Sequence, residues 1–98
     1  MNNKTLNLYL LTQYENDNYD TYDSCVVAAY NKEEAVKIHP YKEYYENYIY
    51  CPELDDEYEL WNSRTWVSSP DKVTCELIGI ATKGIAPNSV ICSSFNAG

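Results

Sequence analysis

Apolar and polar residues alternate over several short runs of this chain, with the two-residue period of a β-strand. In residues 5–11, TLNLYLL, leucines at the even positions lie on one face, and Asn7, Tyr9 and Leu11 lie on the other. This pattern predicts a strand with one buried face. Residues 24–30, SCVVAAY, are apolar and partly β-branched, which predicts a strand covered on both faces.

Three more strands are predicted in the second half of the chain. They are SRTWV at residues 63–67, KVTCELIGIAT at residues 72–82 and SVICSSF at residues 89–95. Trp66 anchors the first of them. The stretch between the two early strands, QYENDNYDTYD, is rich in Asn, Asp and Tyr and predicts an ordered loop.

One helix is predicted, from Lys32 to His39. Asn31 can cap its first backbone N–H groups, and Glu34 follows three residues later, as in a capping box. Pro40 cannot continue a helix without losing a hydrogen bond, so the helix should end before it.

The order of these elements indicates an α+β fold in a single domain that spans residues 1–98. We expect one mostly antiparallel sheet of about five strands, with the single short helix packed on its apolar face. Residues 41–60 keep neither the helical nor the strand period for long. A second helical turn or a strand near Tyr45–Tyr50 would both be compatible with them, and the segment is left irregular.

The net negative charge of the chain limits the kinds of molecule that it can bind. Seven basic and fifteen acidic residues give a formal net charge of −8, which repels phosphate backbones and anionic membranes and attracts basic protein surfaces. We therefore expect no direct binding to nucleic acid or membrane. No run approaches the roughly 18 apolar residues that cross a bilayer, and no basic, apolar signal segment opens the chain. A soluble protein of the cytoplasm is expected.

The four cysteines are expected to remain thiols in that compartment, and no CxxC pair is present to build a conventional zinc finger or ribbon. His39, the single histidine, has two interpretations. A protonated ring at the end of the predicted helix would interact favourably with the helix dipole. Alternatively, His39 with Cys92 or Cys51 and a carboxylate such as Asp23 would make a mixed zinc site.

Catalysis finds little support in the sequence. A cysteine nucleophile needs a neighbouring base, for which His39 is the one histidine, and all three glycines lie from Gly79 onward, so there is no phosphate-binding glycine loop. We expect a protein that is not an enzyme.

The most unusual stretch is YKEYYENYIYCPELDDEYEL, residues 41–60, with six tyrosines and seven carboxylates against one lysine. Carboxylates along a surface can occupy the places that phosphates take in a basic channel, and tyrosine rings add contact area at low entropic cost. The simpler alternative is an acidic face that only keeps the protein in solution. The residues predicted to bind a partner are Glu43, Tyr44, Tyr45, Glu46, Tyr48, Asp55, Asp56, Glu57 and Glu59.

Several stretches carry a resemblance to a family of short proteins encoded by bacteriophages and prophages. They are LYLLTQYENDNYDTYDSCVVAA, EEAVKIHP, WVSSPDKVTCELIGIA and VICSSFNAG, and the most specific pieces are YDTYDS, IHP and SFNAG. The resemblance does not extend across residues 41–62. Within the family, this chain is similar to type II anti-CRISPR proteins, which bind the nuclease Cas9. The resemblance also places Asp23, His39 and Cys92, all capable of binding zinc, in shared positions.

Together, these observations favour a phage-encoded inhibitor that acts in the cytoplasm of an infected bacterium. It would bind a host nuclease, Cas9 above all, through the acidic tyrosine-rich surface and block nucleic-acid loading. The alternative is a small structural or accessory phage protein that is stabilised by zinc and has no inhibitory role. The sequence leaves the oligomeric state and the strand order open.

Overall fold

A computed structural model describes residues 5–16, 20–43 and 65–96. Its strands are β1 (Asn7–Thr12), β2 (Thr21–Ala29), β3 (Thr74–Ile80) and β4 (Ser89–Asn96). The helical elements are α1 (Lys32–Ala35) and two 3₁₀ turns, η1 (Pro40–Glu43) and η2 (Pro70–Lys72). No helix in these ranges has the length and apolar character needed to cross a membrane.

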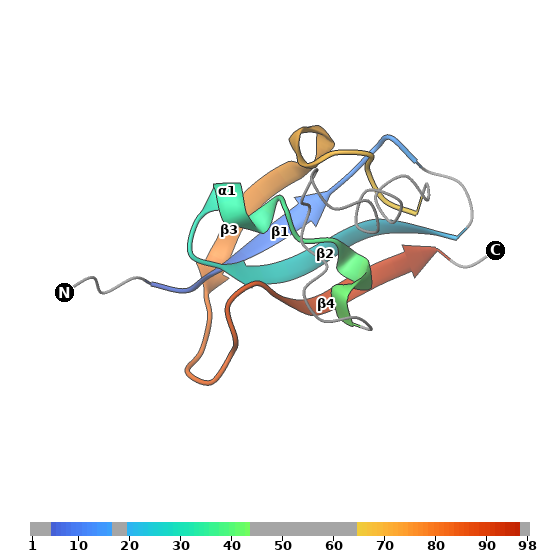
Figure 1. Cartoon of the computed structure of the whole chain (residues 1–98). Helices are drawn as coiled ribbons and strands as arrows, with labels where there is room; N and C mark the ends of the chain where they lie inside the picture. Colours follow the sequence, from blue (N-terminus) through green and yellow to red (C-terminus); the bar gives the residue numbers. More distant parts are fainter. Residues whose placement is uncertain (1–4, 17–19, 44–64, 97–98) are drawn as a thin grey trace.

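The four strands form one antiparallel sheet in the order β3-β1-β2-β4 (Figure 1). The predicted α+β class and antiparallel sheet are confirmed, with four strands in the described ranges where about five were expected. β3 and β4 follow one another in the chain but lie at opposite edges. Residues 81–88 join them around one end of the sheet (Figure 1).

The missing strand is the one predicted at residues 63–67. Residues 65–67 are bends and irregular backbone, while residues 63 and 64 lie outside the described ranges. Trp66 and Val67 are fully buried in the core, so this part of the chain packs into the core and is not a strand of the sheet. Trp66 does anchor the segment, as predicted, but by packing and not by strand pairing.

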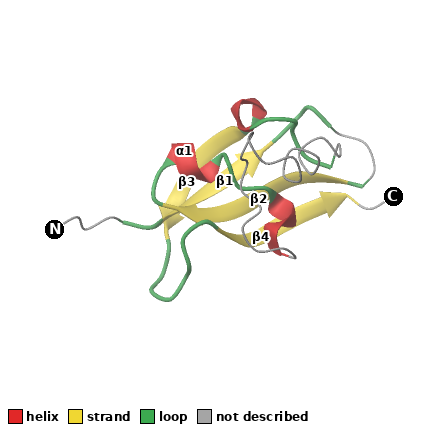
Figure 2. Ribbon diagram, in the orientation of Figure 1, coloured by secondary structure: helices red, strands yellow, loops and turns green. Residues whose placement is uncertain are grey.

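The core lies on one face of the sheet, which α1 and η1 cover (Figure 2). In β1, the buried side chains on this face are Tyr9 and Leu11, and the leucines at even positions are only half-buried on the opposite face. Leu11 pairs with Cys25 on β2 and with Cys75 on β3, so one row of side chains crosses three strands. The period of β1 was predicted correctly, and packing decides which face is buried.

β2 begins three residues before the predicted position. Residues 21–23, expected in a loop, form its first part. Thr21 and Tyr22 pair with the end of β4, and Asp23 is the extra residue of a bulge. Asp20 has a positive φ of 62°, a conformation that aspartate tolerates better than most residues, and it turns the chain into the strand. Tyr22 is then buried, with its ring 4.8 Å from that of Phe95.

The helix is shorter than predicted and ends at Ala35 instead of His39. Its start is as expected, because Asn31 Oδ1 accepts a hydrogen bond from the Glu34 backbone N–H at 2.8 Å. Beyond Ala35 the backbone tightens to three-residue hydrogen bonds, which direct Ile38 and His39 into the core.

Candidate functional site

Most of the predicted binding surface lies outside the described residues. This holds for Tyr44, Tyr45, Glu46, Tyr48, Asp55, Asp56, Glu57 and Glu59, and for the side chain of Glu43, whose backbone ends η1. The structure does describe the two chain segments that flank residues 44–64. We call residues 39–41 the first anchor and residues 65–67 the second anchor.

The first anchor is built around His39. The His39 ring is fully buried, and its Nδ1 accepts a hydrogen bond from the Tyr41 backbone N–H at 3.0 Å. Pro40 between them is also buried, and the ring of Tyr41 lies edge-on to that of His39 at 6.4 Å. The segment that precedes the acidic stretch is therefore held in a fixed position.

The second anchor lies in the same core. Thr65 O accepts a hydrogen bond from the Tyr22 N–H at 2.8 Å, and Trp66 O accepts one from Asn16 Nδ2 at 2.6 Å. Val67 is buried next to Trp66. The second anchor is thus held by hydrogen bonds to its backbone carbonyl groups and by the burial of the Trp66 indole in the core.

Tyr22 connects the two anchors. Its backbone N–H binds the second anchor, and its ring lies edge-on to His39 of the first anchor at 6.5 Å. Both ends of the acidic stretch are therefore fixed near Tyr22, in the first part of β2. From the sequence, Tyr22 was assigned to a loop, and its tyrosine-rich surroundings gave no sign of this role.

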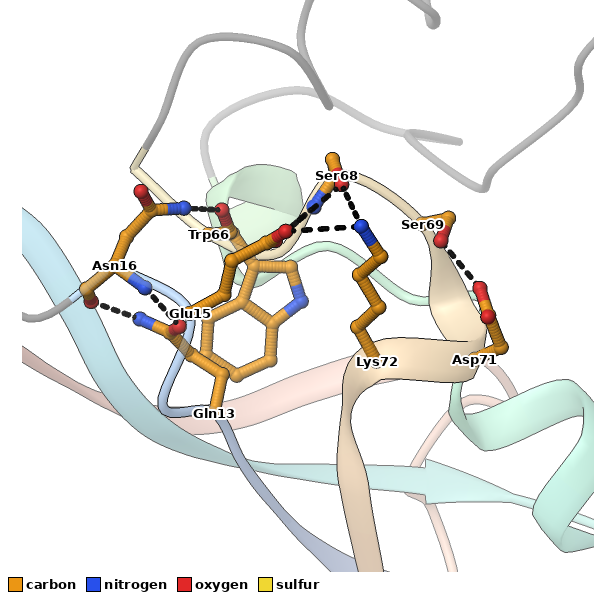
Figure 3. A network of polar contacts seen from close by, with 8 residues as sticks. All are labelled: Gln13, Glu15, Asn16, Trp66, Ser68, Ser69, Asp71 and Lys72. Carbon is orange, nitrogen blue, oxygen red and sulfur yellow. Dashed lines mark hydrogen bonds and ion pairs between the residues drawn. The ribbon is translucent and has the colours of Figure 1, made fainter.

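A polar network supports the second anchor from outside (Figure 3). Glu15 accepts hydrogen bonds from the Ser68 backbone N–H at 2.8 Å and from Lys72 Nζ at 3.1 Å. Gln13 Oε1 accepts from the Asn16 N–H at 2.8 Å and so orients the loop that carries Asn16. Slight burial raises the pKa of the Glu15 carboxyl, but the hydrogen bonds from Ser68 and Lys72 outweigh it and lower the pKa overall.

Replacement of Glu15 with glutamine tests this network. The amide keeps an acceptor for Ser68 but loses the ion pair to Lys72, so the free energy of unfolding at pH 7 should fall by about 1 kcal/mol or less. Because the folded pKa is lowered, the carboxylate stabilises the fold above its ordinary value of 4.5, and this contribution is lost as pH falls below it. The difference between the two proteins in urea unfolding should therefore shrink at pH 3. A difference that grows in acid would contradict the assignment.

His39 does not act as the predicted helix cap. It lies four residues beyond the end of α1, and burial lowers the pKa of its imidazole from 6.5 to about 3. At pH 7 the ring is neutral, so it makes no favourable charge interaction with the dipole of α1. The prediction of a protonated ring at the helix end is wrong because the chain after Ala35 turns inward.

The predicted metal ligands are not brought together. Within the described ranges, no three His, Cys, Asp or Glu side chains are grouped in a way that would hold a metal ion. Asp23 and Cys92 are exposed while His39 is fully buried, and Cys92 pairs with Val26 on the sheet face opposite the core. Asp23, His39 and Cys92 therefore do not form a zinc site in this structure; Cys51 lies outside its described part.

The described cysteines are free thiols, as predicted. Cys25 is a core residue, and burial raises the pKa of its thiol well above the ordinary value, with smaller contributions from Cys92 and Cys75. Burial also raises the pKa of Cys75, which is half-buried against the core. Thiols held protonated in this way are poor nucleophiles.

Charge is distributed unevenly along the chain. The described ranges hold eight acidic and five basic residues, whereas residues 44–64 hold six acidic residues and Arg64. The described ranges are thus only mildly acidic, and much of the net charge belongs to residues 44–64. No family of proteins, curated protein or solved structure matches the chain.

Proposed function

We propose that this protein is a non-enzymatic inhibitor that binds a basic protein surface through its acidic, tyrosine-rich segment, residues 43–59. The observation that carries the proposal is the composition of this segment, in which seven carboxylates and no basic residue occur among tyrosines. A surface of this kind is attracted to the Lys- and Arg-lined channels that hold nucleic acids.

The resemblance to phage proteins gives the proposal its specific form. The partner is a host defence nuclease, and Cas9 is the preferred candidate, because its guide and target strands occupy a positively charged channel. Carboxylates of residues 43–59 would take the place of phosphates there, and the tyrosines would supply contact area. The protein would then block the loading of nucleic acid by occupying its path.

The two anchors support the proposal. Binding segments are commonly carried by a rigid scaffold. If the two ends of such a segment are already fixed, less conformational entropy is lost when the segment binds its partner. Here His39 and Trp66, one in each anchor, are both fully buried, and Tyr22 contacts both anchors. A partner that binds residues 43–59 would meet a segment whose two ends are already positioned.

Reversal of charge within the segment tests the proposal. The double variant Glu46→Lys and Glu57→Lys changes the net charge from −8 to −4. It should associate with purified Cas9 at least about tenfold more slowly than the wild type, because electrostatic steering acts mainly on the association rate. Raising salt should slow wild-type association in the same direction.

The matched control changes the net charge equally but on the scaffold. Asp23→Lys and Glu33→Lys replace two exposed acids, one on β2 and one on α1. This variant should retain most of the wild-type association rate. If the association rate falls equally in both variants, binding depends on net charge and not on residues 43–59. If the wild type does not bind Cas9, or binds it at a rate that salt does not change, the proposed mechanism is wrong.

A further inference from the structure

β3 is an edge strand of the sheet, because the order β3-β1-β2-β4 leaves it paired on one side only. An edge strand presents backbone N–H and C=O groups that can pair with another chain. Within the described ranges, β3 hydrogen-bonds to β1 alone among the strands, and its packing contacts beyond β1 are with α1.

The side chains of β3 are unusually apolar for an exposed edge. Leu77, Ile78 and Ile80 are 59%, 48% and 69% exposed, and they make up half of the large hydrophobic side chains exposed in the described part of the chain. Glu76 is the one charged residue in β3, and the strand lacks the Lys and Pro residues that commonly protect edges. A single bulge interrupts it, where Ile78 is the extra residue between the pairs Leu8–Gly79 and Tyr9–Leu77.

β4, the other edge, differs in two ways. It packs against η1, and two serines, Ser93 and Ser94, separate Phe95 from its other apolar residues. The β3 edge is therefore the better candidate for a docking surface.

Charges at the two ends of β3 indicate what could occupy that edge. Asp71, exposed, lies six residues before Leu77, and Lys83, also exposed, lies six residues after it. Lys83 has no ion-pair partner among the described residues, whereas Lys72 is paired with Glu15. The strand is thus flanked by an acid at its start and by a free cation at its end.

We propose that β3 pairs antiparallel with β3 of a second copy of this chain, around a twofold axis near Leu77. Antiparallel pairing places the start of one strand beside the end of the other, so Lys83 of each copy would lie close to Asp71 of its partner. A parallel arrangement would bring like charges together. This charge complementarity selects a second copy as the occupant, and the pairing would join two four-stranded sheets into one.

The apolar side chains fit the same arrangement. With Leu77 near the axis, Glu76 of one copy would lie opposite Ile78 of the other and not opposite Glu76. Cross-strand contacts between β-branched and aliphatic side chains stabilise an antiparallel pair, whereas like charges directly opposite destabilise it. The proposal does not depend on the proposed function, because it is argued from β3 and its flanking residues alone.

Sedimentation equilibrium of the full chain tests the pairing at about 0.15 M salt, where a Debye length of about 8 Å screens the repulsion between two acidic molecules. The wild type should dimerise within a range of about 1 μM to 1 mM. Ile78→Lys places a charge on the edge and should weaken the dimer at least about tenfold. A wild type that stays monomeric throughout this range overturns the proposal.

Ile91→Lys is the matched control. Ile91 is 43% exposed and is the extra residue of the bulge in β4, just as Ile78 is in β3. The control should leave the dimer intact. If Ile91→Lys dissociates the dimer and Ile78→Lys does not, the interface is at the other edge and the proposal fails.

A charge exchange tests the orientation. Lys83→Glu alone and Asp71→Lys alone each create two contacts between like charges in the dimer, and each should weaken it about tenfold. The double variant restores opposite charges at both contacts and should recover most of the wild-type affinity. Additive losses in the double variant would exclude the antiparallel pairing.

Discussion

Replacing Trp66 with alanine should lower the free energy of unfolding by about 3–5 kcal/mol, the usual effect of removing a buried aromatic side chain. Trp66 is fully buried and is the largest side chain in the core, where it packs with residues of β1 and β2. Its Nε1–H has no hydrogen-bond partner among the described residues, so its contribution comes from apolar packing. Urea unfolding at pH 7 measures the effect.

Tyr14→Ala is the control for this prediction. Tyr14 is also aromatic and belongs to the loop between β1 and β2, but it is 80% exposed. Its removal should change stability by no more than about 0.5 kcal/mol. Equal effects of the two substitutions would show that Trp66 is not part of the core.

Lowering the pH from 7 to 5 should destabilise the fold by about 2 kcal/mol through His39 alone. The buried ring has a folded pKa of about 3, against an ordinary value of 6.5. Above pH 6.5 the ring is neutral in both the folded and the unfolded chain, and its protonation does not reduce the free energy of unfolding. As pH falls from 6.5 toward 3, the unfolded chain binds a proton that the folded chain does not, so the free energy of unfolding decreases. Over the whole interval the loss approaches about 5 kcal/mol. Denaturant unfolding at a series of pH values measures it.

His39→Asn separates this titration from other effects of pH. The Asn amide oxygen can accept the hydrogen bond that Nδ1 accepts from Tyr41, but it does not titrate. The variant should be less stable at pH 7, because it loses the edge-on contacts with Tyr22 and Tyr41. Its stability should then stay nearly constant down to pH 5. Parallel losses in the variant and the wild type would mean that His39 is not the titrating group.

The strands of this protein were predictable where local pattern and packing agree. Alternation in β3 and β4 placed both strands within a few residues of their observed bounds. For β1 the same alternation allowed two faces, and the leucine-bearing face is the more apolar by composition. The structure buries Tyr9 and Leu11 instead, because these side chains meet Val27 and Cys25 under the covering helix and anchors.

Residues 65–67 show the opposite case. An isolated Trp-Val pair next to a threonine has high β-propensity, yet propensity is easily overridden by burial. Trp66 is more favourable inside the core than along an edge, and the Asn16 and Tyr22 hydrogen bonds satisfy its neighbouring backbone. Asn16 and Tyr22 lie more than forty residues earlier in the chain, so a short stretch of sequence around Trp66 cannot reveal these hydrogen bonds.

The candidate site divides in the same way. Composition alone identified the acidic, tyrosine-rich segment, since a local excess of charge is visible in the sequence. Its anchoring at Tyr22 was not predictable, because it depends on three segments that meet only in the folded chain. The zinc hypothesis rested on residue types capable of binding metal, which carry no information about their distance, and the described Asp23, His39 and Cys92 are not grouped.

By itself, the sequence determined the elements whose stability is local: the alternating strands, the Asn31 cap and the excess of negative charge in residues 43–59. Only the tertiary structure decided which face of β1 is buried, that Trp66 is a core anchor, that His39 is neutral and that β3 is an exposed edge. The physical reason is that burial and desolvation are properties of surroundings assembled from distant segments, whereas periodicity and charge belong to neighbouring residues.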